Sequence, residues 1–163
     1  MSAETLNLDK LAAERSQAIV IEVRQKAEKE AEEKAKKEKI PIEQTEKAKH
    51  ALRKRRTETL ERLDTKALGV LQEQGVYALM LFLFSRTSDE ERVAPVIRAQ
   101  LYKALKQIPD FKDVPLEESD GPEKVLAIYA NDVLNDLDTV LLVRDLYEQT
   151  LIYTRYGAKA ARE

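Results

Sequence analysis

The run Val-Tyr-Ala-Leu-Met-Leu-Phe-Leu-Phe, residues 76–84, is the most apolar part of the sequence. A helix that is hydrophobic on every side is either the buried centre of a bundle or is covered by a partner. Gly75 stands directly before the run and can end a preceding helix in a left-handed conformation. A membrane span needs about 20 apolar residues, so this short run predicts a core helix in a soluble, cytoplasmic protein.

Long helices are predicted on both sides of this run. Only 4 glycines and 5 prolines interrupt 163 residues, of which 36% are charged and 43% are hydrophobic. A sheet needs many turns, so this scarcity of turn residues favours a few long elements. We therefore predict an all-α fold, a single helical bundle of about five to six helices that occupies residues 1–163 as one domain. The sequence has no cysteine, which fits a reducing compartment, and residues 1–20 show no signal-peptide pattern.

An extended charged hairpin is predicted near the N-terminus. The apolar stripe of the first helix changes from leucine, isoleucine and valine to alanine after Val23, so residues 25–39 can bury little surface. Pro41 ends this helix and can open the next one. Residues 25–60 are therefore expected to form a charged helical hairpin extension, whereas residues 109–121 are expected to form a loop.

Capping residues mark several predicted helix ends. Asn7 or Asp9 can cap the first helix, because a short acceptor side chain satisfies the free N–H groups there. Ser88 and Glu91 have the spacing of a capping box. Gly121-Pro122 is expected to restart a helix after the loop.

The sequence offers no constellation of catalytic groups. The single histidine, His50, has no histidine or cysteine companion and lies in a basic stretch. Asp132 and Asp136 stand four apart on a predicted helix, but Mg²⁺ and Ca²⁺ usually need more than two oxygen ligands. We expect no catalytic residue, no metal, no cofactor and no small-molecule substrate, and we predict that the protein is not an enzyme.

Charge is distributed unevenly along the chain. Residues 110–138 contain nine carboxylates against two lysines, whereas residues 47–56 contain six cations and no carboxylate. A basic cluster can follow a phosphate backbone without reading sequence, or it can simply balance acidic neighbours. A chain with a basic and an acidic region can also stack head to tail on its own copies. The six cations are Lys47, Lys49, Arg53, Lys54, Arg55 and Arg56. At about 100° per residue, Lys49, Arg53 and Arg56 fall within roughly 60° of one another.

Three segments resemble the small helical subunit of type III-B CRISPR effector complexes (the Cmr small subunit). Leu68-Gly-Val-Leu-Gln-Glu-Gln-Gly-Val-Tyr-Ala-Leu-Met-Leu-Phe-Leu-Phe-Ser-Arg86 is similar to the family's central pattern, in which a helix ends in a polar residue and glycine and an apolar helix closes on serine and a basic residue. Residues 14–18 resemble its first helix and residues 146–158 its last. The last helix departs from the family in lacking the usual tryptophan and in placing Tyr156 where a second basic residue is common. The hairpin 25–60 looks like an enlargement.

This resemblance implies a non-catalytic role in antiviral defence. Small subunits of the family stack into a short filament and hold guide RNA and target RNA through sequence-independent backbone contacts, while other subunits carry the nuclease and cyclase activities. The resemblance implies RNA contact for Arg15, Arg86 and Arg155, and the cluster at 47–56 joins them on electrostatic grounds only. The alternative for each arginine is a surface ion pair.

Other functions stay open at this point. A helical scaffold or adaptor that binds only protein can use the 76–84 helix or the tyrosine-rich last helix. The counterpart small subunit of type III-A complexes is the nearest relative in pattern. A DNA-binding regulator is the least favoured, because no recognition helix after a short turn stands out.

Overall fold

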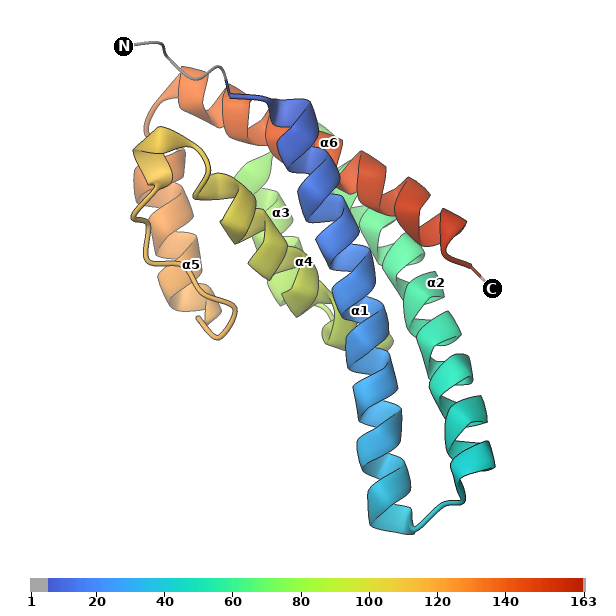
Figure 1. Cartoon of the computed structure of the whole chain (residues 1–163). Coiled ribbons are helices and arrows are strands. Elements are labelled where there is room, and N and C mark those ends of the chain that lie inside the picture. The colour runs from blue at the N-terminus through green and yellow to red at the C-terminus, as the bar shows by residue number, and fades with distance from the viewer. Residues whose placement is uncertain (1–5, 163) are drawn as a thin grey trace.

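The computed structural model describes residues 6–162, and within this range every regular element is helical (Figure 1). This confirms the all-α bundle of about five to six helices. The α-helices are α1 (Leu8–Glu38), α2 (Ile42–Gln74), α3 (Val76–Phe84), α4 (Asp89–Leu105), α5 (Pro122–Ile128) and α6 (Leu137–Ala160). Two short segments accompany them, the 3-10 turn η1 (Pro109–Phe111) and the π-helical η2 (Tyr129–Val133).

Helices α1 and α2 form the predicted antiparallel hairpin, and its turn extends beyond the other helices (Figure 1). Asn7 caps α1, since its side-chain oxygen accepts a hydrogen bond from the backbone N–H of Lys10 at 3.0 Å. At the other end Lys39 takes a left-handed conformation with φ 52° and closes the helix. The alanines that continue the α1 stripe after Val23 are buried. They are Ala27, Ala31 and Ala35.

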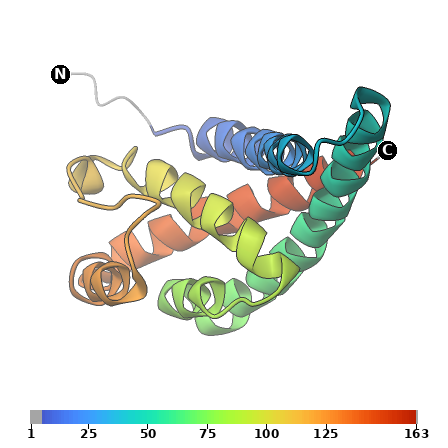
Figure 2. The same cartoon turned by 90° about the horizontal axis from the view of Figure 1, so that it is seen from below.

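Gly75 separates α2 from α3, as the sequence predicts. Its φ of 96° and ψ of −173° lie in a region that is essentially restricted to glycine, and this differs from the left-handed helical conformation expected for it. The glycine lets the chain turn while its N–H still donates to the carbonyl of Leu71 at 3.0 Å. The abrupt change of direction places α3 against α2 and α4 (Figure 2).

Helix α3 buries one face and leaves part of the other exposed. Val76, Leu79 and Met80 are fully covered, whereas the side chain of Leu81 is 46% exposed. Two guanidinium groups cover aromatic rings at the C-terminal end of α3. The guanidinium carbon of Arg86 lies 3.8 Å from the centre of the Phe82 ring, and that of Arg98 lies 4.1 Å from the centre of the Phe84 ring. These cations shield apolar rings at an end of the helix that the bundle leaves partly open.

The core lies where α6 crosses α1 and α2, at the end away from the hairpin turn (Figures 1 and 2). Large side chains from four helices fill it without exposure, among them Ile19, Leu63, Ile97, Leu101 and Leu151. Such a core is typical of helix packing driven by apolar stripes.

The connection from α4 to α6 is partly packed. The expected loop at 109–121 contains η1, and its side chains Phe111 and Leu116 are buried. A helix then begins at Pro122, as the Gly-Pro pair predicts. The predicted capping box at Ser88 is wrong: its backbone has φ 58°, its hydroxyl makes no capping bond, and its carbonyl accepts from the N–H of Glu91 at 3.2 Å instead.

Candidate nucleic-acid interface

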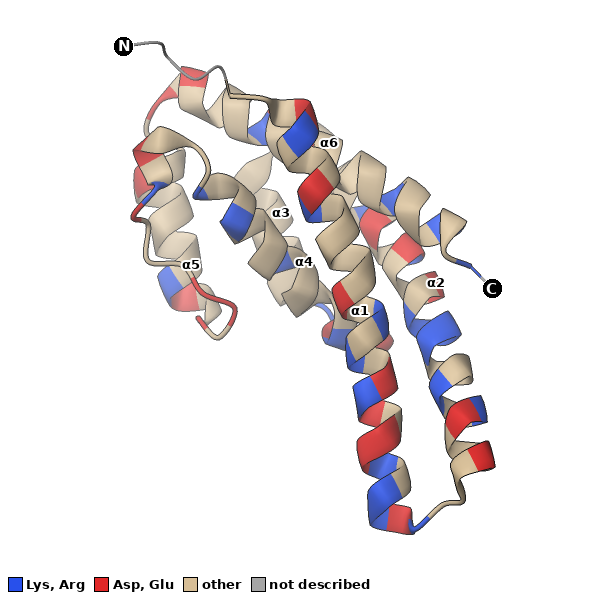
Figure 3. Cartoon of the chain, viewed as in Figure 1, with Lys and Arg blue, Asp and Glu red and all other residues tan. Residues whose placement is uncertain are grey.

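The predicted RNA-contacting cations lie on separate elements. Arg15 is on α1, the cluster 47–56 is on α2, Arg86 follows α3, and Arg155 is on α6. Figure 3 shows acidic and basic positions interspersed along the hairpin part of α1, beside the basic stretch 47–56 of α2. The neighbours of each cation therefore decide whether it is available to a phosphate.

One side of the cluster on α2 is paired with glutamates of α1. Lys49 Nζ lies 2.7 Å from Glu32 Oε1, and Arg53 Nη1 lies 2.6 Å from Glu28 Oε1. The Lys49 ammonium holds the pKa of Glu32 below its usual range, and the hydrogen bond with Glu32 raises the pKa of Lys49. A phosphate at this side has to compete with carboxylates that are already in place.

The sequence indicates that this side of α2 faces a neighbouring helix. Lys49, Arg53 and Arg56 do share one side of α2, as their spacing predicts, but it is the same side as the buried leucines. The steps from Lys49 to Arg53, Arg56, Leu60 and Leu63 are four, three, four and three residues. The cations thus continue the apolar stripe toward the hairpin turn, where their partners are the glutamates of α1.

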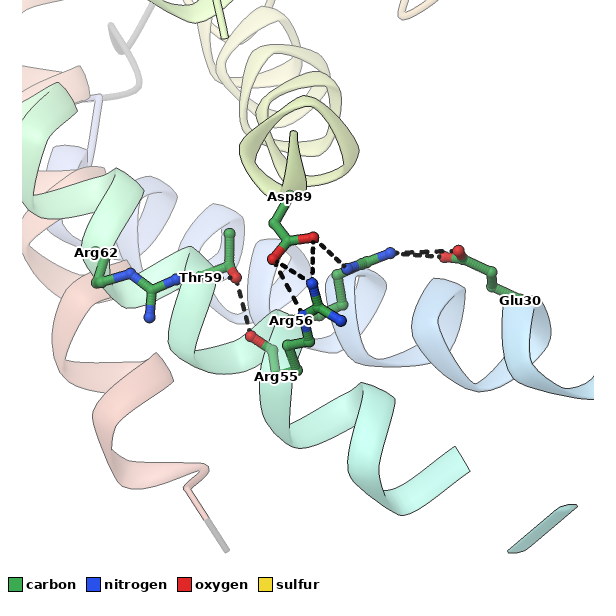
Figure 4. Close-up of polar contacts among 6 residues, drawn as sticks. All are labelled: Glu30, Arg55, Arg56, Thr59, Arg62 and Asp89. Atoms are coloured by element: carbon green, nitrogen blue, oxygen red, sulfur yellow. Dashed lines mark hydrogen bonds and ion pairs between the residues drawn. The ribbon is translucent and has the colours of Figure 1, made fainter. Parts of the chain in front are cut away.

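Two arginines of the cluster hold the start of α4 (Figure 4). Arg55 donates through Nε and Nη2 to the carboxylate of Asp89 at 2.8 to 3.1 Å. Arg56 reaches Asp89 at 3.4 Å and Glu30 at 3.2 Å. The Arg55 hydrogen bonds lower the pKa of the Asp89 carboxyl. Since Asp89 is the first residue of α4, this network fixes α1, α2 and α4 together.

Arg15 and Arg86 also have partners within the protein. Arg15 Nη1 donates to Gln100 Oε1 at 2.9 Å and so joins α1 to α4. Arg86 Nε donates to the carbonyl of Phe82 at 2.9 Å, and Arg86 Nη1 lies 3.5 Å from Glu90 Oε1. Both arginines have structural contacts that a phosphate would have to replace or share.

Three of the predicted cations are exposed and make no ion pair with any described residue. Lys47 and Lys54 are seven residues apart on α2, which places them on one side of that helix. Arg155 is exposed on α6. Its positive charge acts on Asp64 of α2, opposing the burial that raises the pKa of that carboxyl well above its ordinary value.

Asp64 itself is a feature that the sequence reasoning missed. Its side chain is fully buried, and neither carboxyl oxygen has a hydrogen-bond partner among the described residues. Its position between Leu60 and Leu68, four residues from each, places it within the apolar stripe of α2.

The acidic segment lines a separate hollow of about 560 Å³, bordered by Asp110, Asp113, Asp132 and Asp136. Asp136 already caps α6, since its carboxylate accepts from the N–H of Thr139 at 3.1 Å. Within residues 6–162 no group of three or more histidine, cysteine or acidic side chains is arranged to hold a metal ion.

The single histidine lies beside a cation of the basic cluster. The His50 ring nitrogen Nδ1 is 3.2 Å from Arg53 Nη2. None of the described helices has the length and apolarity that a membrane crossing requires.

In comparisons with family models, curated proteins and solved structures, the chain matched none.

Proposed function

We propose that this chain is a non-catalytic small subunit of an RNA-guided antiviral complex of the type III-B CRISPR class. The observation that carries the proposal is the junction at Gly75, because it has the form of the pattern that the sequence resembles. A long helix ends at Gln74, the glycine turns the chain, and an apolar helix follows up to Ser85-Arg86. The all-helical bundle is compatible with such a subunit.

In this role the chain binds other subunits, copies of itself, and guide and target RNA through sequence-independent phosphate contacts. The cations best suited to RNA are the exposed ones that make no ion pair with any described residue, namely Arg155, Lys47 and Lys54. Arg15, Arg86 and the α1-facing part of the cluster contribute mainly by holding the helices in place.

A protein-only scaffold is the second candidate, and one observation favours it. Four of the six cations in the cluster 47–56 are engaged in ion pairs within the chain, which reduces the positive field available to a polyanion. A type III-A small subunit is expected to bind RNA in the same way as a type III-B small subunit. The identity of the partner subunits therefore has to distinguish the two types of complex.

Purification of the tagged chain from its own cells under nuclease-free conditions tests the proposal. We expect copies of the chain, other effector subunits identified by mass spectrometry, and short RNAs that carry CRISPR repeat sequence. The identity of the accompanying subunits separates type III-B from type III-A. Protein partners without enriched RNA, compared with a purification from untagged cells, would contradict the proposal and favour the scaffold.

A further inference from the structure

The C-terminal half of α6 exposes an aromatic ring among cations. The side chain of Tyr156 is 64% exposed, and Arg155 and Lys159 beside it are exposed as well. Residues 149–162 contain no carboxylate, although the first half of the same helix contains three. This surface therefore combines a ring that is open to solvent with a local excess of positive charge.

The position of the cations on α6 is explained by the helix dipole, but the exposure of the Tyr156 ring is not. The C-terminus of a helix attracts positive side chains through its dipole, and Arg162 is already paired with Glu61 at 3.0 Å. Arg155 and Lys159, in contrast, have no ion pair with any described residue. An exposed tyrosine gains nothing from the helix dipole, and its apolar ring remains in contact with water.

A shallow apolar hollow lies between α1 and α6. Gly157, the residue after Tyr156, lines it together with Val20 and Ile21, and the volume of the hollow is about 260 Å³. A side-chain carbon at Gly157 would lie only 3.3 Å from Val20, so the absence of a side chain there lets α1 and α6 approach closely. Ile21 is 54% exposed.

We infer that this part of α6 binds an unpaired nucleotide of RNA, with the Tyr156 ring stacked on the base and Arg155 and Lys159 at the flanking phosphates. The inference rests on the proposed function, which makes RNA the polymer. Positions three apart on a helix share one side, so Tyr156 and Lys159 face a ligand together. Stacking on aromatic rings is the usual way in which proteins hold unpaired bases, whereas the bases of a duplex cover one another's faces.

The protein contains no tryptophan, so the variant Tyr156→Trp supplies a single fluorescent reporter at this site. We expect single-stranded oligoadenylate to quench its emission. An abasic strand of equal length and a fully paired duplex are expected to quench it far less. Leu137→Trp, at the start of the same helix between Asp136 and Asp138, where the side chain is 72% exposed, serves as the matched control and should stay unquenched.

Binding of dye-labelled single-stranded RNA to further variants gives an independent readout. Tyr156→Ala should weaken binding about fivefold or more, because stacking on one base contributes roughly that much at its lower limit. Tyr156→Phe keeps the ring and should bind within about twofold of the wild type, a difference below the lower limit of stacking.

Three results would overturn the inference. Equal quenching by the abasic strand shows that phosphates, and not a base, lie at the ring. Labelled RNA that binds while the introduced tryptophan stays unquenched places RNA elsewhere and leaves the proposed function standing. No binding of RNA, with quenching only by a co-purified protein, assigns the surface to a protein partner; the RNA recovered from cells then decides the proposed function separately.

Discussion

Replacement of the buried carboxyl of Asp64 by an amide is expected to stabilise the protein. Asp64→Asn changes one atom at a fully buried position where neither carboxyl oxygen has a hydrogen-bond partner among the described residues. Burial raises the pKa of this carboxyl well above its ordinary value, and Arg155 on α6 opposes the rise only in part. At neutral pH the folded protein must therefore either hold a proton on Asp64 or bury an unpaired charge.

The sign of the pH dependence follows from this raised pKa. Below the unfolded-state pKa of about 3.9 both states hold the proton, and Asp64 adds no pH-dependent cost. As the pH rises through that value, the folded state loses stability by up to about 1.4 kcal/mol per pH unit, until the pH passes the folded-state pKa. An amide carries no charge, so Asp64→Asn removes this pH-dependent cost although the side chain stays polar and buried. We expect a gain of at least about 1.4 kcal/mol at pH 7, which corresponds to one pH unit of this slope, or roughly 3–6 °C in melting temperature for a chain of this length.

Thermal unfolding at pH 4 and pH 7, followed by circular dichroism, measures this effect. The difference between Asp64→Asn and the wild type should be small at pH 4 and large at pH 7. Asp145→Asn, an exposed carboxylate on α6, is the control and should change stability by no more than about 0.5 kcal/mol. If Asp64→Asn is less stable than the wild type at pH 7 but not at pH 4, the carboxylate is paired in the folded protein and the reasoning is refuted.

Three further substitutions test the packing that positions the candidate interface, each by thermal unfolding. Gly75→Ala should lower the free energy of unfolding by about 1–3 kcal/mol, because the φ of 96° at this position disfavours any side chain although space is open around it. The control is Gly69→Ala, which is also in open space but inside α2, and it should raise the free energy of unfolding by up to about 1 kcal/mol. Equal effects of the two substitutions would refute a backbone origin. Arg56→Gln should cost about 1–2 kcal/mol because its bonds to two carboxylates disappear, and a cost no larger than that of Lys54→Gln would contradict the ion-pair network. Tyr129→Phe leaves the buried hydroxyl of Tyr147 without its hydrogen-bond partner at 2.6 Å and should lower the free energy of unfolding by about 1–3 kcal/mol. Replacement of both tyrosines by phenylalanine should cost less than the sum of the two single replacements.

The long helices and their boundaries were predictable from local chemistry. Pro41 and Gly75 separate the first three helices because one residue lacks a backbone donor and the other can adopt a conformation that side chains disfavour. The Gly121-Pro122 restart follows in the same way. The π-helical segment Tyr129–Val133 was not predictable, because no local pattern in the sequence indicates it; the Tyr129 hydroxyl within it meets Tyr147 of α6.

The side of α2 on which the basic cluster lies was predictable, but its ion-pair partners were not. The spacing of Lys49, Arg53 and Arg56 continues the stripe of buried leucines, whereas the glutamates that pair with them depend on how α1 is aligned against α2. The exposed ring of Tyr156 was likewise hidden, since the tyrosines of α6 include both the buried Tyr147 and this exposed one. Burial depends on where the helix is covered, and that is a property of the whole bundle.

In the proposed function, the chain binds RNA phosphates through the cations that its own carboxylates leave unpaired. The dependence of single-stranded RNA affinity on salt concentration tests this binding directly. The logarithm of the binding constant falls linearly with the logarithm of the salt concentration, and the magnitude of this slope should decrease by about 0.7 for each phosphate that the protein no longer neutralises. It should therefore decrease when Arg155→Gln and Lys159→Gln are combined, and stay unchanged in Arg56→Gln where the fold is retained. An affinity that is insensitive to salt, or a slope that changes only with Arg56, would contradict binding through the unpaired cations.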